Sequence, residues 1–283
     1  LMLEYYFSIL EGRRPARHWL ASRVATGLGD IEDMSDEELW SRHRSAMEAF
    51  RDLLSSGEEP DRVDGPTLLD LKAVLARRML SSCHMCERRC GVDRTAGERG
   101  YCGVGEVSRV ASMFLHFGEE PELVPSHTVF FSGCTFACVY CQNWQISHKR
   151  DPDRITTPEE FAKVALELEA DGAHFIGLVS PSHQVPQIKD ALIEARSRGL
   201  SIPYVYNSSG YDSIESLKSL EGLISVYLPD LKYSDDAVAK RLSKVDNYVE
   251  TARNAMMEMH RQVGDIELDP KTGLSRMGFC GRH

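Results

Sequence analysis

Residues 130–147 read F-F-S-G-C-T-F-A-C-V-Y-C-Q-N-W-Q-I-S, and the cysteines in this stretch are Cys134, Cys138 and Cys141. The apolar, β-branched and aromatic residues 128–131 predict a buried strand that ends just before the first cysteine. The cysteines therefore lie on a loop at the carboxyl end of a strand, which is where α/β folds bind their ligands.

The C-x3-C-x2-C spacing suits a metal centre, because three thiolates within eight residues can wrap one centre. A cubane iron–sulfur cluster has four irons and structural clusters use four cysteines, so three local ligands leave one iron open to a group that is not protein. The alternatives are a zinc site, for which His148 is a candidate fourth ligand, and buried thiols that bind no metal.

Composition excludes several classes of protein. The chain has 283 residues, a net charge of −10 and no run of Lys or Arg, which argues against nucleic acid as the main partner. No apolar stretch approaches the ~20 residues that span a bilayer, and no signal peptide is visible. Seven of the eight cysteines fall in two tight clusters, a pattern that favours metal binding in a reducing compartment and predicts a cytoplasmic protein. The eighth, Cys280, is isolated and is interpreted as a buried thiol.

A second cluster of cysteines lies upstream, among glycines. Cys83, Cys86, Cys90 and Cys102 are separated by two, three and eleven residues. Four thiolates can close a tetrahedral zinc site or hold a complete iron–sulfur cluster, so a second metal site of open identity is predicted. The alternative is four cysteines without metal in a glycine-rich loop.

Hydrophobic periodicity and capping signals predict an N-terminal helical segment followed by alternating strands and helices. The capping boxes at Ser35–Glu38 and Thr157–Glu160 mark two helix starts. Helices are expected at 35–54, 68–80, from 157 onward, 185–198, 214–220, 235–242 and 249–263. Strands are expected at 107–117, 128–131, 175–179, 202–206, 223–228 and from about 277. This alternation predicts an α/β fold with a parallel sheet.

The cysteine loop, with Tyr140 before its last cysteine, resembles the signature of the radical SAM superfamily. The resemblance implies a partial (β/α) barrel of which about four of six units are present, and so a chain that is a fragment truncated at its C-terminus. The expected domains are a helical segment at 1–80, a four-cysteine module at 81–125 and a radical SAM core at 126–283.

Within that superfamily the chain is most similar to the PflX-like proteins related to pyruvate formate-lyase activating enzyme. The motifs that carry this likeness are the cysteine run at 83–103, H-F-G-E-E-P at 116–121, F-F-S-G-C at 130–134, C-V-Y-C-Q-N at 138–143, Y-N-x-x-G-Y-D at 206–212, Y-L-P-D-L-K-Y at 227–233 and E-M-H-R-Q-V-G at 258–264.

The resemblance implies roles for individual residues. The three cysteines of the loop would ligate a [4Fe-4S] cluster whose open iron chelates S-adenosylmethionine (SAM), and Tyr140 would contact the adenine. Asn207 would contact SAM, and Asp230 and Lys232 would lie near it. The Gly-Gly-Glu of the family's second strand, which holds the SAM ammonium, is replaced by residues 180–183, S-P-S-H. Ser180 or Ser182 would then accept a hydrogen bond from the ammonium, although a neutral oxygen is a weaker partner than a carboxylate.

Two functions are compatible with these residues. The first is a radical SAM oxidoreductase that cleaves SAM to a 5′-deoxyadenosyl radical and abstracts hydrogen, with a low-potential electron donor of the flavodoxin or ferredoxin type. By resemblance, its substrate is a protein, a glycine in a partner enzyme. The second is a non-catalytic iron–sulfur or zinc protein that acts as an electron carrier or an interaction module.

Overall fold

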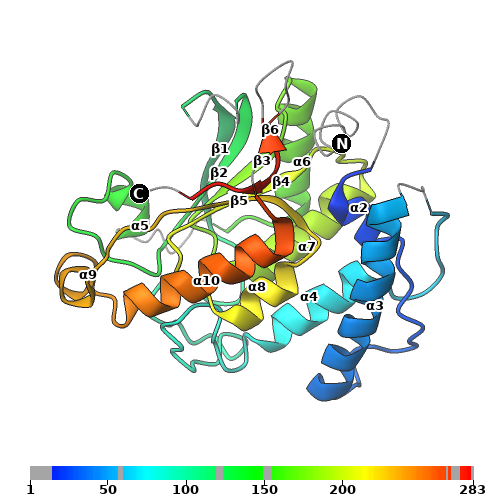
Figure 1. Cartoon of the computed structure of the whole chain (residues 1–283), viewed down its shortest axis with the longest axis horizontal. Coiled ribbons are helices and arrows are strands. Elements are labelled where there is room, and N and C mark those ends of the chain that lie inside the picture. Colours follow the sequence, from blue (N-terminus) through cyan, green and yellow to red (C-terminus); the bar gives the residue numbers. More distant parts are fainter. Residues whose placement is uncertain are drawn as a thin grey trace.

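The computed structural model describes residues 15–56, 60–118, 124–148, 155–265, 267–268 and 275–281 (Figure 1), so residues 119–121 of the H-F-G-E-E-P motif lie outside it. The helices are α2 (Arg17–Ala21), α3 (Asp36–Ser56), α4 (Leu68–Arg78), α5 (Trp144–Ser147), α6 (Pro158–Ala170), α7 (Val185–Ser197), α8 (Ile214–Leu220), α9 (Asp236–Ser243) and α10 (Tyr248–Val263). The strands are β1 (Val110–His116), β2 (Ser126–Phe131), β3 (Ile176–Val179), β4 (Tyr204–Ser208), β5 (Ile224–Pro229), β6 (Glu267–Leu268) and β7 (Ser275–Phe279). Within these ranges, no helix has the length and apolar character needed to cross a membrane.

The described strands form a seven-stranded sheet in the order β1-β2-β3-β4-β5-β7-β6. Strands β2, β3, β4, β5 and β7 are parallel, whereas β1 and β6 pair antiparallel with β2 and β7. One row of the register runs through Val129, Leu178, Tyr206 and Tyr227, and all four side chains are fully buried. The predicted α/β class is therefore confirmed, and the loops after β2 to β5 share one edge of the sheet.

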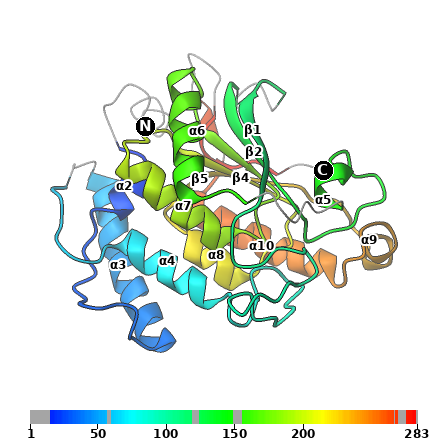
Figure 2. The same ribbon diagram turned by 180° about the vertical axis from the view of Figure 1, so that it is seen from behind.

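Helices α6, α7, α8 and α10 follow one another along the sheet, and α4 packs outside α7 and α8 (Figures 1 and 2). The side chains of the strands alternate in direction, so one set joins these helices in the main apolar core. The other set, with Val205, Val226 and Leu228, forms a smaller cluster. Leu20 and Phe50 from the N-terminal helices belong to the main core, and a Cβ added at Gly222 would lie 2.9 Å from the Phe50 ring. The N-terminal helices thus pack directly against the α/β unit.

Capping boxes start three of the helices. Ser35 and Glu38 cap α3 reciprocally, with the Ser35 N–H donating to the Glu38 carboxylate at 3.0 Å. Thr157 and Glu160 form the same motif at α6, followed by a proline in the first turn. A third box, which the sequence analysis did not single out, joins Thr67 to Asp70 at the start of α4. Each box satisfies backbone N–H groups that have no partner within the helix.

Strand β4 is shifted by two residues, because it was expected at 202–206 and lies at Tyr204–Ser208. Its pairing with β3 continues to Val179 opposite Asn207, so Asn207 and Ser208, which were expected to follow the strand, are part of it. This extension carries the Asn207 backbone to the edge where the cysteine loop begins.

Candidate functional site

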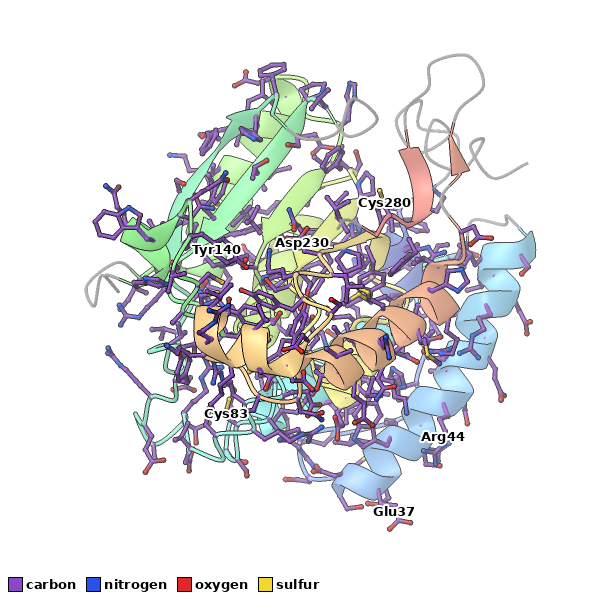
Figure 3. All side chains as sticks on the ribbon, turned by 60° about the vertical axis from the view of Figure 1, so that its left-hand side comes forward. Glu37, Arg44, Cys83, Tyr140, Asp230 and Cys280 are labelled. Atoms are coloured by element: carbon purple, nitrogen blue, oxygen red, sulfur yellow. The ribbon has the colours of Figure 1, made fainter. Side chains whose placement is uncertain are left out.

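A cavity of about 580 Å³ lies at the carboxyl ends of β2, β3, β4 and β5. Four successive parallel strands supply its wall: Phe130 at the end of β2, Val179 at the end of β3, Asn207 on β4 and Asp230 directly after β5. Figure 3 labels Tyr140 and Asp230, which both line it. The volume lies within the range of about 300–1,000 Å³ that is typical of small-molecule sites.

The cavity brings together most of the residues predicted from the sequence. Those that line it are Cys134, Cys138, Tyr140, Cys141, Ser180, Asn207, Asp230 and Lys232. Ser182 is not among the lining residues, because its side chain is buried and hydrogen bonded to Asp212. Asp212 also accepts hydrogen bonds from the hydroxyls of Tyr206 and Ser208, so it ties the loop after β3 to β4.

Each thiol of the C-x3-C-x2-C loop has its own polar neighbour. The Phe136 N–H donates to Cys134 Sγ at 3.4 Å, the Ser243 hydroxyl donates to Cys138 Sγ at 2.9 Å, and the Ser147 hydroxyl lies 3.3 Å from Cys141 Sγ. Burial raises the pKa of Cys134 to about 11 and also raises that of Cys138. Binding of a metal centre here therefore releases protons, since the ligand is the thiolate.

The donor set fits an iron–sulfur cluster better than a single ion. A tetrahedral zinc ion with Zn–S bonds of about 2.3 Å brings its sulfurs to about 3.8 Å from one another. In the described part of the chain, no three His, Cys, Asp or Glu side chains are placed so that they could hold one metal ion. The ligands of a cubane cluster bind different irons and stand further apart, around a shared space. His148, the candidate fourth zinc ligand, is exposed and is absent from the described lining.

A chain of hydroxyl groups links the aromatic residue of the motif to one of its cysteines. The Tyr140 hydroxyl is hydrogen bonded to that of Tyr233, which is hydrogen bonded to Ser243, the donor to Cys138. Ser243 was not predicted as a site residue; it lies at the end of α9 and is 105 residues from Cys138. No local spacing could have indicated this contact, since it depends on how α9 folds back over the loop.

Asp230 and Lys232 form an ion pair at one side of the cavity, with Lys232 Nζ 2.6 Å from Asp230 Oδ2. Tyr248 holds their backbone: its hydroxyl accepts from the Lys232 N–H at 2.8 Å and donates to the Asp230 carbonyl at 3.0 Å. Asp230 is the one carboxylate among the described lining residues. Both charged side chains are about three-quarters buried, so the pair presents fixed charge to a ligand in the cavity.

The loop after β3 places Ser180 in the lining of the cavity and buries His183 outside that lining. Ser180 lines the cavity in a left-handed conformation with φ of 51°, and its N–H donates to the Asn207 carbonyl at 2.8 Å. His183, considered above as a part of the same four-residue stretch, is buried away from the lining. Its Nε2 lies 3.0 Å from the Ser132 carbonyl, and its own carbonyl accepts two hydrogen bonds from Arg94. His183 therefore joins strand ends and does not replace the family's glutamate.

The upstream cysteine module lies directly against the cluster loop at Gly133, the residue before Cys134. Gly133 has φ of 80°, and a Cβ added there would lie 2.4 Å from the Cys102 carbonyl oxygen. Only glycine fits both the backbone conformation and this close approach.

The Gly133→Ala variant is therefore expected to be less stable than Gly172→Ala, which is its matched control. Gly172 has φ of 96° and nothing within 4 Å of an added Cβ, so its variant bears the conformational cost alone, about 1–2 kcal/mol. The free energy of unfolding of Gly133→Ala should fall by a further ~1–3 kcal/mol, because the backbone at residue 133 must move away from the Cys102 carbonyl. Urea unfolding of both variants measures the difference, and equal losses would contradict the contact.

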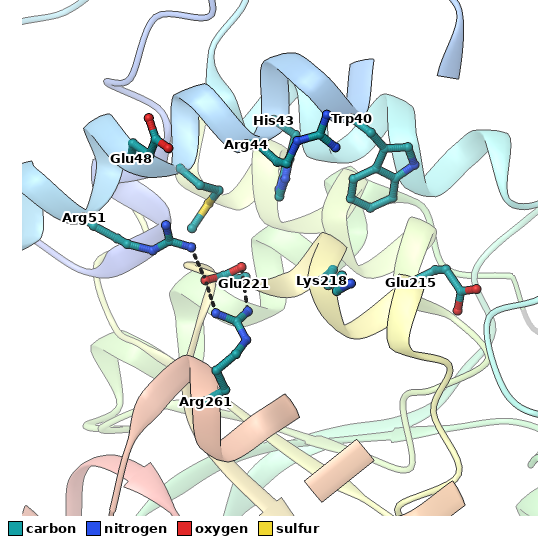
Figure 4. A pocket seen from close by; sticks show the side chains of 10 residues that line it. Trp40, His43, Arg44, Glu48, Arg51, Glu215, Lys218, Glu221 and Arg261 are labelled. Atoms are coloured by element: carbon teal, nitrogen blue, oxygen red, sulfur yellow. Dashed lines mark hydrogen bonds and ion pairs between the residues drawn. The ribbon is translucent and has the colours of Figure 1, made fainter. Parts of the chain in front are cut away.

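A separate cavity of about 470 Å³ lies between α3, α8 and α10 (Figure 4). Its charged groups largely satisfy one another, because Arg51 and Arg261 both bind Glu221, at 2.8 and 3.0 Å. None of the residues predicted from the sequence to bind a metal or a cofactor lines it. We therefore take the cavity at the carboxyl ends of the strands as the functional site.

The chain is similar to known proteins over most of its length. A family model of the Radical SAM superfamily matches residues 128–265, which run from within β2 to the second residue after α10 and include Cys134, Cys138 and Cys141. The uncharacterized protein MJ0674 of Methanocaldococcus jannaschii is 34% identical over 261 residues, which cover 88% of this chain and 73% of that protein.

A second protein of the same organism, the uncharacterized protein MJ0808, is 30% identical over 160 residues. That alignment covers 49% of this chain and 46% of the relative. Radical SAM domains use a [4Fe-4S] cluster and SAM, and three cysteines beside a polar cavity are the donor set that this pair requires. The chain therefore belongs to the radical SAM superfamily, with the superfamily's domain at residues 128–265.

Proposed function

We propose that this protein is an enzyme that reductively cleaves SAM and uses the resulting radical to abstract hydrogen, in the manner of the pyruvate formate-lyase activating enzymes and their PflX-like relatives. One observation carries the proposal. The thiols of Cys134, Cys138 and Cys141 line the same cavity as the polar side chains of Asn207 and Asp230. A cluster with an open iron and a charged small molecule would thus share one site.

In this proposal the three cysteines hold the cluster and the strand ends hold SAM. Tyr140 lies beside the cluster loop and packs against the adenine. Asp230 supplies the negative charge for the SAM ammonium that the missing glutamate would otherwise provide, and the Ser180 hydroxyl adds a hydrogen bond. Lys232 remains available to pair with the SAM carboxylate, since its Nζ carries three donors.

A cluster held by Cys134, Cys138 and Cys141 would supply the electron for the reductive cleavage of SAM, and this cleavage would supply the radical that abstracts hydrogen from the substrate. The protein's own part is to fix the sulfonium at the cluster and to keep water from the site. The Ser243 hydroxyl stabilises negative charge on Cys138 through its hydrogen bond, a contact of the kind that tunes the potential of a cluster.

The electron in this proposal comes from a low-potential donor of the flavodoxin or ferredoxin type. Val139 and Trp144 are exposed apolar side chains on and next to the cluster loop, and they offer such a donor a docking surface. We also propose that the parallel strands are the first units of a radical SAM partial barrel, that the substrate is a protein, and that the thiol-rich chain works in the reducing cytoplasm.

The test is product release by the anaerobically reconstituted protein after reduction with dithionite in the presence of SAM. The proposal expects 5′-deoxyadenosine and methionine in equal amounts, measured by mass spectrometry. Absence of both products from a cluster-loaded protein would contradict it, and would favour the non-catalytic electron carrier or interaction module.

The Lys232→Ala variant is expected to bind SAM roughly 10- to 100-fold more weakly, because the SAM carboxylate loses a charged hydrogen bond and Asp230 loses its ion pair with Lys232. Lys240→Ala is the matched control, since Lys240 also pairs with an aspartate, Asp246, but lies outside the described lining of the cavity. Equilibrium dialysis of radiolabelled SAM measures both. Equal affinities in the two variants would remove Lys232 from the SAM site.

A further inference from the structure

We propose that Cys83, Cys86, Cys90 and Cys102 hold a second, fully ligated iron–sulfur cluster of the [4Fe-4S] type. The peptide that carries these cysteines packs against the loop that carries Cys134 and fixes its position. This site goes beyond the function proposed above. The superfamily match begins at residue 128, so it does not cover these cysteines.

The peptide around the four thiols is folded tightly. The Cys83 N–H donates to the Val92 carbonyl and the Gly91 N–H donates to the Cys83 carbonyl, both at 3.0 Å. These two hydrogen bonds close the loop of residues 83–92. A Cβ at Gly100 would lie 2.8 Å from Cys90 Sγ, so the second half of the module presses on the first. The two halves of the four-cysteine module therefore pack against each other.

The arrangement favours a cluster over zinc. Four thiolates on one zinc ion would approach one another to about 3.8 Å. Among the residues that the structure describes, these cysteines do not form a group that could hold a single ion, and neither do the three cysteines of the radical SAM loop. Four cysteines are the ligand set of a complete cluster, whereas the radical SAM loop supplies three.

Arg94 provides an independent indication of negative charge at this site. Its side chain is fully buried, and it contacts two backbone carbonyls and a thiol. The carbonyls of Val104 and His183 accept hydrogen bonds at 2.9 Å, and Cys102 Sγ lies 3.7 Å from Nη2. Within the described residues, no carboxylate forms an ion pair with it. A buried guanidinium without a counter-charge is costly, and a cluster held by four thiolates carries a net negative charge.

The module contacts the radical SAM loops at several points. Besides the close approach of the Cys102 carbonyl to Gly133, Arg88 Nε donates to the Thr135 carbonyl at 2.9 Å. Arg94 binds the carbonyl of His183 after β3, and the Glu87 N–H donates to the Tyr211 carbonyl after β4. A metal centre that fixes the module therefore also fixes the residues on both sides of Cys134.

The experiment measures iron, sulfide and zinc in the full chain after anaerobic reconstitution, with Cys90→Ala, Cys138→Ala and Cys280→Ala as variants. Cys90 is exposed, so its replacement disturbs the core least. We expect about eight irons per chain in the unaltered protein and in Cys280→Ala, and about four in each of the other two. The Cys90→Ala variant should keep the change that SAM causes in the electron paramagnetic resonance (EPR) spectrum, whereas Cys138→Ala should lose it.

About four irons in the unaltered protein, or one zinc per chain that Cys90→Ala removes, would overturn the second cluster. If Cys90→Ala does not fold, the unaltered reduced protein decides alone, since two clusters give two EPR signals of which one is insensitive to SAM. Failure of the proposed function has a different signature, in which two clusters are present and neither responds to SAM.

Discussion

Replacement of Cys138 by alanine is expected to remove the cluster at the C-x3-C-x2-C loop and to lower SAM cleavage by more than about 100-fold. Two remaining thiolates cannot hold a cubane, and the Ser243 hydroxyl would lose its acceptor. Cys280→Ala is the control, because Cys280 packs beside the small apolar cluster and does not line the cavity in the described structure. Iron content and 5′-deoxyadenosine yield measure the effect.

An unchanged iron content in Cys138→Ala would contradict the assignment of this loop as the cluster ligand set. Loss of iron together with retained SAM cleavage would contradict the mechanism, since the open iron is where SAM is held. The Cys90→Ala variant of the upstream module distinguishes the two metal centres, because it should lose the second cluster and keep the one at Cys138.

The second large effect concerns two lysines buried in the helical layer. Lys72 and Lys189 are both fully buried, and none of their hydrogen-bond partners in the described residues is a carboxylate. Lys72 Nζ lies 2.6 Å from His43 Nε2, and Lys189 Nζ donates to Ser219 Oγ at 2.7 Å. Burial lowers the pKa of Lys72 to about 7 and lowers that of Lys189 as well.

The burial of Lys72 makes the free energy of unfolding depend on pH in a defined direction. Between about pH 7 and the usual lysine pKa of about 10.4, the unfolded chain binds a proton at Lys72 that the folded chain does not. The free energy of unfolding therefore rises with pH across this window, by roughly 3–5 kcal/mol for Lys72. Lys72→Met should remove the contribution of Lys72 to this pH dependence and raise the free energy of unfolding at pH 7.

Urea unfolding at several values from pH 7 to pH 10 tests this expectation. Lys240→Met is the matched control, because Lys240 is exposed and should leave the slope unchanged. A slope in Lys72→Met equal to that of the unaltered protein would contradict the buried charge. Lys189 contributes with the same sign, so some pH dependence should remain in the variant.

Much of the fold could be predicted from local signals. The helix expected at 214–220 is α8 at Ile214–Leu220, and the starts of α3 and α6 follow from their capping boxes. Caps, proline positions and apolar periodicity act within one or two turns, so a sequence reveals them directly. The cysteine loop could also be predicted from the sequence, because the spacing of its three cysteines is itself the motif.

The contacts that were not predicted all join distant parts of the chain. Ser182 was expected to be a SAM contact and instead hydrogen bonds with Asp212, a residue on the next loop. The links from Ser243 to Cys138 and from Arg94 to His183 likewise depend on how the strand ends converge. Lys72 sits in a helix that was predicted, but its burial depends on the packing of α4 against α7 and α8, which no local pattern contains.

The most direct test of the central claim is the EPR spectrum of the reduced, anaerobically reconstituted full chain, with and without SAM. A cluster with an open iron predicts a spectrum that changes when SAM is added, and a change that is absent in Cys138→Ala. A spectrum that is the same with and without SAM, in a protein that carries its full iron, would contradict the radical SAM function proposed here.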